Sequence, residues 1–174
     1  MIVIGMLITK LKLMKDPIAY WRSKGATIGK DCEIYSSAVL GSEAYLVSIG
    51  DHVRINSNVV FVTHDGGVWV LRNMDAELKN ADIFGKIRVG NNVHIGTGAV
   101  VMPGVTVGNN CIIGVGAVVT RDIPDNSIAV GIPARVIKTV DEYLEQHRAE
   151  LFFTKNMTSD EKKVFLLKNL EKIK

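Results

Sequence analysis

Residues 89–123 read VGNNVHIGTGAVVMPGVTVGNNCIIGVGAVVTRDI, and this stretch decides the fold. A β-branched residue returns at every sixth position, at Val89, Ile95, Val101, Val107, Ile113 and Val119. Four positions after each of these anchors stands a small or aliphatic residue: Val93, Ala99, Val105, Cys111, Ala117 and Ile123. A period of six fits neither the 3.6-residue helix nor a long alternating strand. It predicts a parallel β-helix, an all-β solenoid in which short strands separated by turns wind into stacked coils.

The positions between an anchor and the next small residue are mostly polar or glycine, as in Asn91-Asn92 and Thr97-Gly98. These residues suit the corners of a coil, because Gly and Asn adopt left-handed backbone conformations at low cost. The same rhythm occurs earlier in the chain, at Ile49 and Ile55, so we expect about five coils over residues 26–138. Short strands also build sandwiches and barrels, but six consecutive anchors with a matching second position argue against those folds.

The rhythm is interrupted twice. Three extra residues stand before Ile49, around Glu43-Ala44-Tyr45. The pattern then disappears between Phe61 and Val89, where residues 66–86 are expected to form a loop extruded from one coil. Long loops in compact repeat domains usually carry function.

The composition describes one globular domain with a sizeable core. The chain has 174 residues, of which 47% are apolar and 22% charged. Its formal charge of +3 fits a polyanionic small ligand but is too small to predict nucleic-acid binding. Both cysteines, Cys32 and Cys111, fall at interior positions of the repeat, which favours core packing over a disulfide or a nucleophile.

Both ends of the chain are expected to be helical. Residues 1–25 include Asp16-Pro17, an N-cap followed by proline at the first helical position. Residues 139–174 are rich in Glu, Lys and Leu and are expected to form amphipathic helices that cap the open end of the solenoid. Thr158 and Glu161 supply a capping box for the second of these helices.

The first residues, Met1 to Leu13, are apolar but too few to span a bilayer. They lack the basic start and the small-residue cleavage site of a signal peptide, so we expect a cytoplasmic protein. Lys10, Lys12 and Lys15 form a basic flank that leaves a peripheral membrane contact open.

His64 is the candidate catalytic residue. It follows Val62-Thr63 at the root of the long loop, where a rigid coil can hold an imidazole that solvent reaches. A general base needs both properties. A histidine at a loop edge is more often structural, so its position alone does not decide the matter. Because the chain has no P-loop, nucleophile elbow or metal-type Cys/His spacing, these residues point to direct transfer to an amine or hydroxyl with one base.

Cations gather at the C-terminal end of the repeat. Arg121, Arg135 and Lys138 lie within 18 residues, around the turn Gly131-Ile132-Pro133. They predict either a solvated basic patch or a phosphate site, which guanidinium groups suit.

Four segments together resemble the hexapeptide-repeat acetyltransferases, particularly the maltose/galactoside O-acetyltransferase and capsular or exopolysaccharide branch. They are Val62-Thr63-His64 before a long loop, residues 87–96 (IRVGNNVHIG), Pro103-Gly104-Val105, and residues 131–135 (GIPAR). The resemblance implies a left-handed β-helix and a homotrimer with active sites between subunits. It also implies acetyl-CoA as donor, no metal, and His64 as the general base.

The resemblance further implies a donor site along the coils. Thr97 and Val115 match positions that contact the pantetheine arm, and Thr120 and Arg121 match positions near the far end of the coenzyme. Arg135 and Lys138 match the cations at its phosphates and adenine.

Candidate acceptor contacts are Ser37, Trp69, Arg72 and His94. In galactoside-type relatives the position of His94 is usually Trp, and Ser37 stands where an Asn binds the acceptor. These departures count against a simple maltose or galactoside acceptor and favour a sugar unit of a surface polysaccharide or its nucleotide- or lipid-linked precursor. A streptogramin-type antibiotic is the second candidate acceptor.

Two other classes share the predicted fold. A γ-type carbonic anhydrase needs three zinc-binding histidines, and the expected pair five residues apart is missing here. A non-catalytic solenoid scaffold would explain the coils, but not His64 and its loop combined with the basic C-terminal segment.

Overall fold

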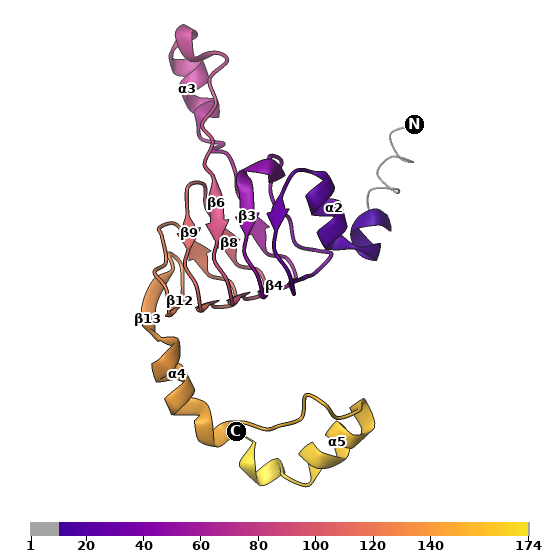
Figure 1. The fold of residues 1–174 in the computed structure, drawn as a ribbon. Coiled ribbons are helices and arrows are strands. Elements are labelled where there is room, and N and C mark those ends of the chain that lie inside the picture. The colour runs from indigo at the N-terminus through magenta and orange to yellow at the C-terminus, as the bar shows by residue number, and fades with distance from the viewer. Residues whose placement is uncertain (1–10, 174) are drawn as a thin grey trace. The chain divides into compact units, whose positions relative to one another are not determined.

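The computed structural model describes residues 11–173, in which short strands stack into three sheets (Figure 1). Sheet 1 contains β1 (Thr27–Ile28), β3 (Val47–Ile49), β6 (Ile87–Val89) and β9 (Thr106–Val107). Sheet 2 contains β2 (Glu33–Ile34), β4 (Val53–Ile55), β7 (Val93–Ile95), β10 (Cys111–Ile113), β12 (Ser127–Val130) and β13 (Arg135–Thr139). Sheet 3 contains β5 (Val60–Phe61), β8 (Val100–Val101) and β11 (Val118–Val119).

The chain visits the sheets in a fixed order, from sheet 1 to sheet 2 to sheet 3 and back to sheet 1. Neighbouring coils pair in parallel with anchor above anchor, as where Ile49 pairs with Val89. The last coil joins sheet 1 through a bridge between Val107 and Ile123 and sheet 2 through β12. The expected solenoid of about five parallel coils is therefore observed.

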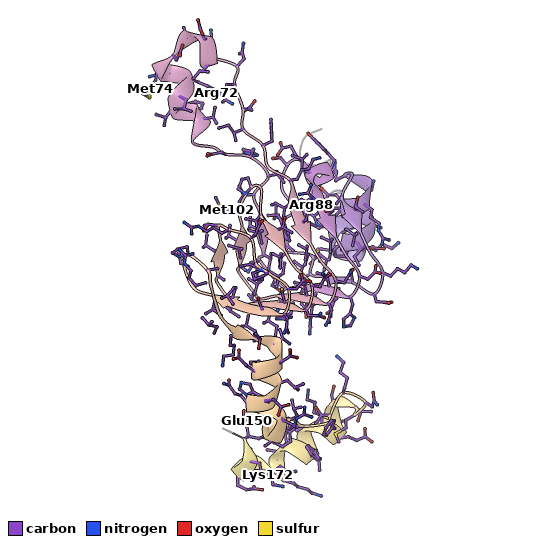
Figure 2. All side chains as sticks on the ribbon, turned by 60° about the vertical axis from the view of Figure 1, so that its left-hand side comes forward. Arg72, Met74, Arg88, Met102, Glu150 and Lys172 are labelled. Carbon is purple, nitrogen blue, oxygen red and sulfur yellow. The ribbon has the colours of Figure 1, made fainter. Side chains whose placement is uncertain are left out.

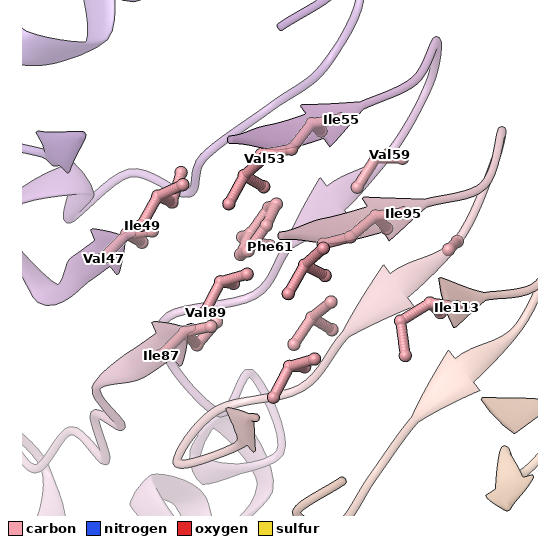
Figure 3. Packing of buried hydrophobic residues seen from close by; sticks show 14 of the residues in the cluster. Val47, Ile49, Val53, Ile55, Val59, Phe61, Ile87, Val89, Ile95 and Ile113 are labelled. Atoms are coloured by element: carbon pink, nitrogen blue, oxygen red, sulfur yellow. The ribbon is translucent and has the colours of Figure 1, made fainter. Parts of the chain in front are cut away.

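The core runs along the inside of the coils (Figure 3). All six anchors and all six second positions of residues 89–123 are buried. Phe61 is the largest fully buried side chain, and it occupies the place that Val101 takes in the next coil. Burying each Val or Ile stabilises the fold by roughly 1.5–3 kcal/mol. Cys111 is buried as predicted, whereas Cys32, in the first coil, is only half-buried.

The corner between sheets 1 and 2 is held by a ladder of Asp and Asn side chains. Asp51, Asn91, Asn109 and Asp125 each accept a hydrogen bond from a backbone N–H of the preceding coil, at 2.7–2.9 Å. In each pair, a glycine precedes the residue whose N–H donates, and it permits this close approach. A Cβ on Gly90, for example, would lie 2.8 Å from Asn109 Oδ1. The following residue turns the chain with a positive φ, as Asn92 does at 54°.

The N-terminal part of the described chain is helical. Residues 11–15 are helical, and α2 (Pro17–Ser23) begins where Asp16 accepts a hydrogen bond from the Ala19 N–H at 2.9 Å. The predicted N-cap and N-terminal proline are thus confirmed, and Trp21 is buried against the first coil. The part of the predicted helical segment before residue 11 lies outside the described residues.

The two interruptions of the repeat have structure of their own. The first contains the short 3-10 helix η1 (Ala44–Leu46). The second carries α3 (Val68–Met74) and the 3-10 helix η2 (Ala76–Leu78) at its tip, where Figure 2 labels Arg72 and Met74. Its two stems are joined by an antiparallel bridge between His64 and Phe84. The long extruded segment is therefore an ordered, partly helical arm.

The C-terminal end of the solenoid differs from the expectation. The repeat predicts parallel coils to about residue 136, but β13 (Arg135–Thr139) pairs antiparallel with β12. The chain turns back after Gly131, whose φ is +95°, so the basic segment forms a reversed strand. A second compact unit, Asp141–Lys174, follows. The helices of this region are α4 (Val140–His147), η3 (Arg148–Glu150), α5 (Ser159–Leu167) and η4 (Leu170–Lys172), and the predicted Thr158–Glu161 capping box is confirmed.

Candidate active site

His64 lies at the corner between sheets 3 and 1, where β5 ends and the extruded arm leaves the coil. The stems of the arm hold its backbone, because Gly85 N donates to Thr63 O and Asp65 N donates to Ile83 O, both at 2.9 Å. Its side chain is 48% exposed. The imidazole is therefore accessible from solvent while its backbone is fixed on both sides, as the sequence predicts for a general base.

The imidazole contacts residues from the first interruption of the repeat. His64 Nδ1 lies 3.1 Å from Glu43 Oε2 and 3.3 Å from Ser42 Oγ. Two hydroxyls donate to the same Glu43 oxygen, Thr63 Oγ1 at 2.6 Å and Ser42 Oγ at 3.0 Å. In the described part of the chain, every hydrogen bond of this ring engages Nδ1.

The electrostatics of this cluster favour an ionised Glu43. The hydrogen bond from Thr63 lowers the pKa of Glu43 most; burial opposes it, and the hydrogen bonds from His64 and Ser42 lower it further. A carboxylate only accepts hydrogen bonds, so Nδ1 of a neutral His64 carries the proton. Nε2 is then the nitrogen with a free lone pair, the state in which an imidazole accepts a proton from a substrate.

Glu43 is the site residue that the sequence analysis did not identify. Three extra residues around Glu43 were the only signal, and they do not indicate which side chain reaches His64. Asp65, the sequence neighbour of His64, instead accepts a hydrogen bond from Gly67 N at 2.8 Å and shapes the start of the arm.

The residues predicted for the donor are spread over several parts of the solenoid. Thr97 and Val115 are exposed at the corner between sheets 2 and 3, one above the other, with Gly116 N donating to Thr97 O at 2.9 Å. Thr120 and Arg121 are exposed just after β11. Arg135 and Lys138 lie on β13, where Lys138 is half-buried and Arg135 is exposed.

Within one chain these donor positions are not gathered around His64. Thr97 and Val115 precede the strands of sheet 3, whereas His64 follows one of them. Thr97 and Val115 therefore stand at the opposite end of the sheet 3 strands from His64. Thr120 and Arg121 follow β11 at the same end as His64, two coils further along the solenoid.

The predicted acceptor residues have varied surroundings. Ser37 Oγ accepts a hydrogen bond from Asn58 N at 3.1 Å, and Trp69 is 76% exposed on the arm. Arg72 pairs with Asp82 and donates from Nε to Ala81 O at 2.8 Å, so its guanidinium ties the two halves of the arm together. His94 points outward from β7 with Nε2 3.5 Å from Asn56 Nδ2, and burial, followed by the charge of Arg54, lowers its pKa.

The outer face of sheet 3 is apolar. Val39, Val60, Val100 and Val118 form a ladder across the coils, and each precedes a buried residue, so their side chains point outward. The outer ladder of sheet 1 is polar by contrast, with Ser48, Arg88 and Thr106 in register. The outer faces of sheets 3 and 1 therefore differ in chemistry.

Residues 11–173 contain no group of three or more His, Cys, Asp or Glu side chains arranged to hold a metal ion. Among the helices of that range, none is both long and apolar enough to cross a bilayer.

Comparison with known proteins gives consistent matches. The family model described as "Bacterial transferase hexapeptide (six repeats)" matches residues 86–121. The chain is 48% identical over 161 residues to Protein CapG of Staphylococcus aureus, covering 90% of this chain and 92% of CapG. It is 41% identical over 113 residues to a galactoside O-acetyltransferase of Escherichia coli (strain K12), covering 61% of this chain and 53% of that protein. Among solved structures, a galactoside acetyltransferase in complex with coenzyme A superposes with a TM-score of 0.58 at 28% identity, covering 87% of this chain and 88% of that one.

Proposed function

The chain belongs to the bacterial transferase hexapeptide family, and we propose that it moves an acetyl group from acetyl-CoA to a sugar hydroxyl. It is an acetyltransferase, and its donor is acetyl-CoA. Our proposal concerns its acceptor, its catalytic residue and its assembly. One observation carries it: an exposed histidine with Nδ1 bound to a carboxylate and Nε2 left for a substrate.

The proposed reaction is a direct transfer. Nε2 of His64 takes the proton of the acceptor hydroxyl while the hydroxyl oxygen attacks the thioester carbonyl. A C–O bond forms, the C–S bond breaks, and the imidazolium returns its proton to the leaving thiolate. A positioned base contributes about 10²- to 10⁴-fold to such a step, and holding donor and acceptor together supplies most of the remainder.

We place the donor along the corner that carries Thr97 and Val115. These residues lie in consecutive coils and expose a continuous edge that suits the pantetheine arm. Thr120 and Arg121, which follow β11, are the residues proposed near the far end of the coenzyme, and Arg135 and Lys138 are the cations proposed for its phosphates and adenine.

This arrangement requires a second copy of the chain, since His64 and Thr97 stand at opposite ends of the sheet 3 strands. We propose a homotrimer of left-handed solenoids in which sheet 3 faces the neighbouring copies. The valine ladder on its outer face supports this choice, because an exposed apolar face is stabilised by burial against a partner. The His64 corner of one copy then meets the Thr97 corner of the next.

The acceptor is proposed to be a sugar unit of a surface polysaccharide or its nucleotide- or lipid-linked precursor. The match to CapG over 92% of that protein supports a relationship beyond the repeat alone. Ser37, Trp69, Arg72 and His94 are the proposed acceptor contacts. His94 is half-buried, and burial lowers its pKa, which favours the neutral imidazole over the charged one. The proposed location is the cytoplasm, where acetyl-CoA is available.

A thiol-release assay tests the proposal directly. Wild-type protein is incubated with acetyl-CoA and a panel of nucleotide sugars, oligosaccharide units, simple galactosides and acetylatable antibiotics. We expect turnover with one or more sugar acceptors, and about a 10²- to 10⁴-fold loss of kcat in His64→Ala with coenzyme A binding retained. His52→Ala is the control, because His52 is exposed at the corner between sheets 1 and 2. Unchanged turnover in His64→Ala would remove this residue from the mechanism, and turnover with antibiotics alone would overturn the sugar acceptor.

A further inference from the structure

The two interruptions of the six-residue repeat leave the solenoid at the same corner, in consecutive coils. Val39 of the first coil and Val60 of the second are bridged in parallel just before both departures. The first interruption then runs through Ser42 and Glu43 to η1, and the second begins at His64. Residues 21 positions apart in sequence are thereby brought into contact at this corner.

Gly41 packs closely against the side chain of Thr63, which brings the first interruption over the second. Gly41 has a φ of +77°, and a Cβ there would lie 2.6 Å from Thr63 Oγ1 and 2.7 Å from Thr63 Cγ2. Any side chain at position 41 would therefore push Ser42 and Glu43 away from Thr63 and His64.

The Glu43 carboxylate is itself held in place. Thr63 is 1% exposed, and its hydroxyl donates to Glu43 Oε2 at 2.6 Å, while Ser42 donates to the same oxygen at 3.0 Å. With the imidazole at 3.1 Å, this oxygen accepts three hydrogen bonds from three side chains. Such convergence on one atom fixes the carboxylate better than a single surface ion pair does.

We propose that Glu43 is the positioning residue of this enzyme, which holds His64 in the tautomer with the proton on Nδ1 and the lone pair on Nε2. This inference rests on the proposed role of His64 as base. Glu43 takes no proton in the reaction. It accepts a hydrogen bond throughout and stabilises the imidazolium that forms when Nε2 receives the proton of the acceptor. Thr63 acts through Glu43 by anchoring its carboxylate.

A purely structural role would give different results, because Glu43 also joins the two interruptions. If it only held them together, its removal would lower the midpoint of thermal unfolding and weaken substrate binding. A positioning role lowers kcat, leaves both KM values near those of the wild type, and changes the tautomer of His64.

The test uses the full chain with Glu43→Ala, Glu43→Asp and Thr63→Val, and Glu33→Ala as the control. Glu33 is an exposed carboxylate paired with Arg54 on the outer face of sheet 2, away from His64. Steady-state kinetics are combined with ¹H–¹⁵N spectra of histidine-labelled protein at a pH where the imidazole is neutral. The His64 signals are identified by their absence in His64→Ala.

We expect kcat to fall about 10²-fold in Glu43→Ala and less in Thr63→Val, with partial recovery in Glu43→Asp and no change in Glu33→Ala. The spectra should show a protonated Nδ1 in the wild type and a shift toward protonated Nε2 in Glu43→Ala. An unchanged kcat, or an Nε2-protonated His64 in the wild type, would overturn the positioning role. The proposed function fails separately, if the wild type transfers no acetyl group or His64→Ala keeps full turnover.

Discussion

Val60 and Val100 pair directly on the neighbouring parallel strands β5 and β8, and both side chains point out of the solenoid. Each is followed by a fully buried residue, Phe61 or Val101. Each of these two strands thus carries one apolar residue that points inward and one that points outward. Only one side can face the core, so the other side forms a surface suited to a partner.

Replacing Val100 with lysine is expected to dissociate the proposed trimer. The substitution would place a charge in an apolar contact between copies, where it is strongly desolvated. Light scattering after gel filtration should show a monomer, and activity should fall because the proposed site takes His64 and the donor residues from different copies. Thr106→Lys is the control, since Thr106 lies in the polar outer ladder of sheet 1. A trimer that survives Val100→Lys would place the interface elsewhere.

Removing a cation from β13 is expected to weaken donor binding. Arg135→Ala and Lys138→Ala should each raise the KM for acetyl-CoA about 10-fold and leave kcat nearly unchanged, because phosphate contacts are made equally in the ground state and the transition state. Lys30→Ala, which removes an exposed cation from the first coil, should leave both constants unchanged. An effect confined to kcat would argue against phosphate contact.

Replacing Arg72 and Asp82 one at a time distinguishes a structural role of Arg72 from a contact between Arg72 and the acceptor. If Arg72 ties the arm together, Arg72→Ala and Asp82→Ala should both increase proteolytic cleavage of residues 65–84. Arg72→Ala should increase it more, since it removes the hydrogen bond to Ala81 O as well as the ion pair. We expect Arg72→Ala also to raise the KM for the acceptor several-fold more than Asp82→Ala does, because only Arg72 is proposed to contact the sugar. Equal KM values in the two variants would leave Arg72 with the structural role alone.

Substitutions of Asn58 test whether a coil corner requires a left-handed backbone conformation. Its φ is +59°, and the equivalent corners of the next coils use Gly98 at +70° and Gly116 at +68°. Asn58→Val should lower the free energy of unfolding by about 1–2 kcal/mol, because a β-branched residue is strained in the left-handed region. Asn58→Gly should stay within about 0.5 kcal/mol of the wild type in urea denaturation. Equal effects of the two substitutions would contradict the strain argument.

Asp125 should contribute a pH-dependent share of stability. The hydrogen bond from the backbone N–H of Asn109, and then that from its side chain, lowers the pKa of Asp125 below its ordinary value of 3.8. The group therefore stabilises the fold above that pH, and the contribution is lost as the pH falls through the lowered pKa. Asp125→Asn keeps an acceptor and removes the titration, as Asn91 and Asn109 do in the coils before it.

Urea denaturation at pH 6 and at pH 3 should thus show a larger loss of stability in the wild type than in Asp125→Asn. Identical losses would mean that the carboxylate of Asp125 gains nothing from the ladder in the folded state.

The sequence predicted several elements for sound physical reasons. The anchors from Val89 to Val119 are buried, because a six-residue period brings every anchor to the inside of a coil. Gly90 is needed for the close approach of the Asn109 side chain, a role that the residue spacing does not indicate. The reversed strand after Gly131 was missed, because pairing direction depends on where the chain returns in space.

Periodicity by itself determined the stacked coils, the buried residues and the location of His64 at the root of an extruded arm. Those features follow from local spacing, which repeats every six residues and needs no knowledge of distant segments. Only the tertiary structure decided that Glu43 binds His64, that the valines of sheet 3 share one outer face, and that Arg72 ties the arm. Such contacts depend on how far each interruption carries the chain and on which coils stack, and residue spacing along the chain does not encode those distances.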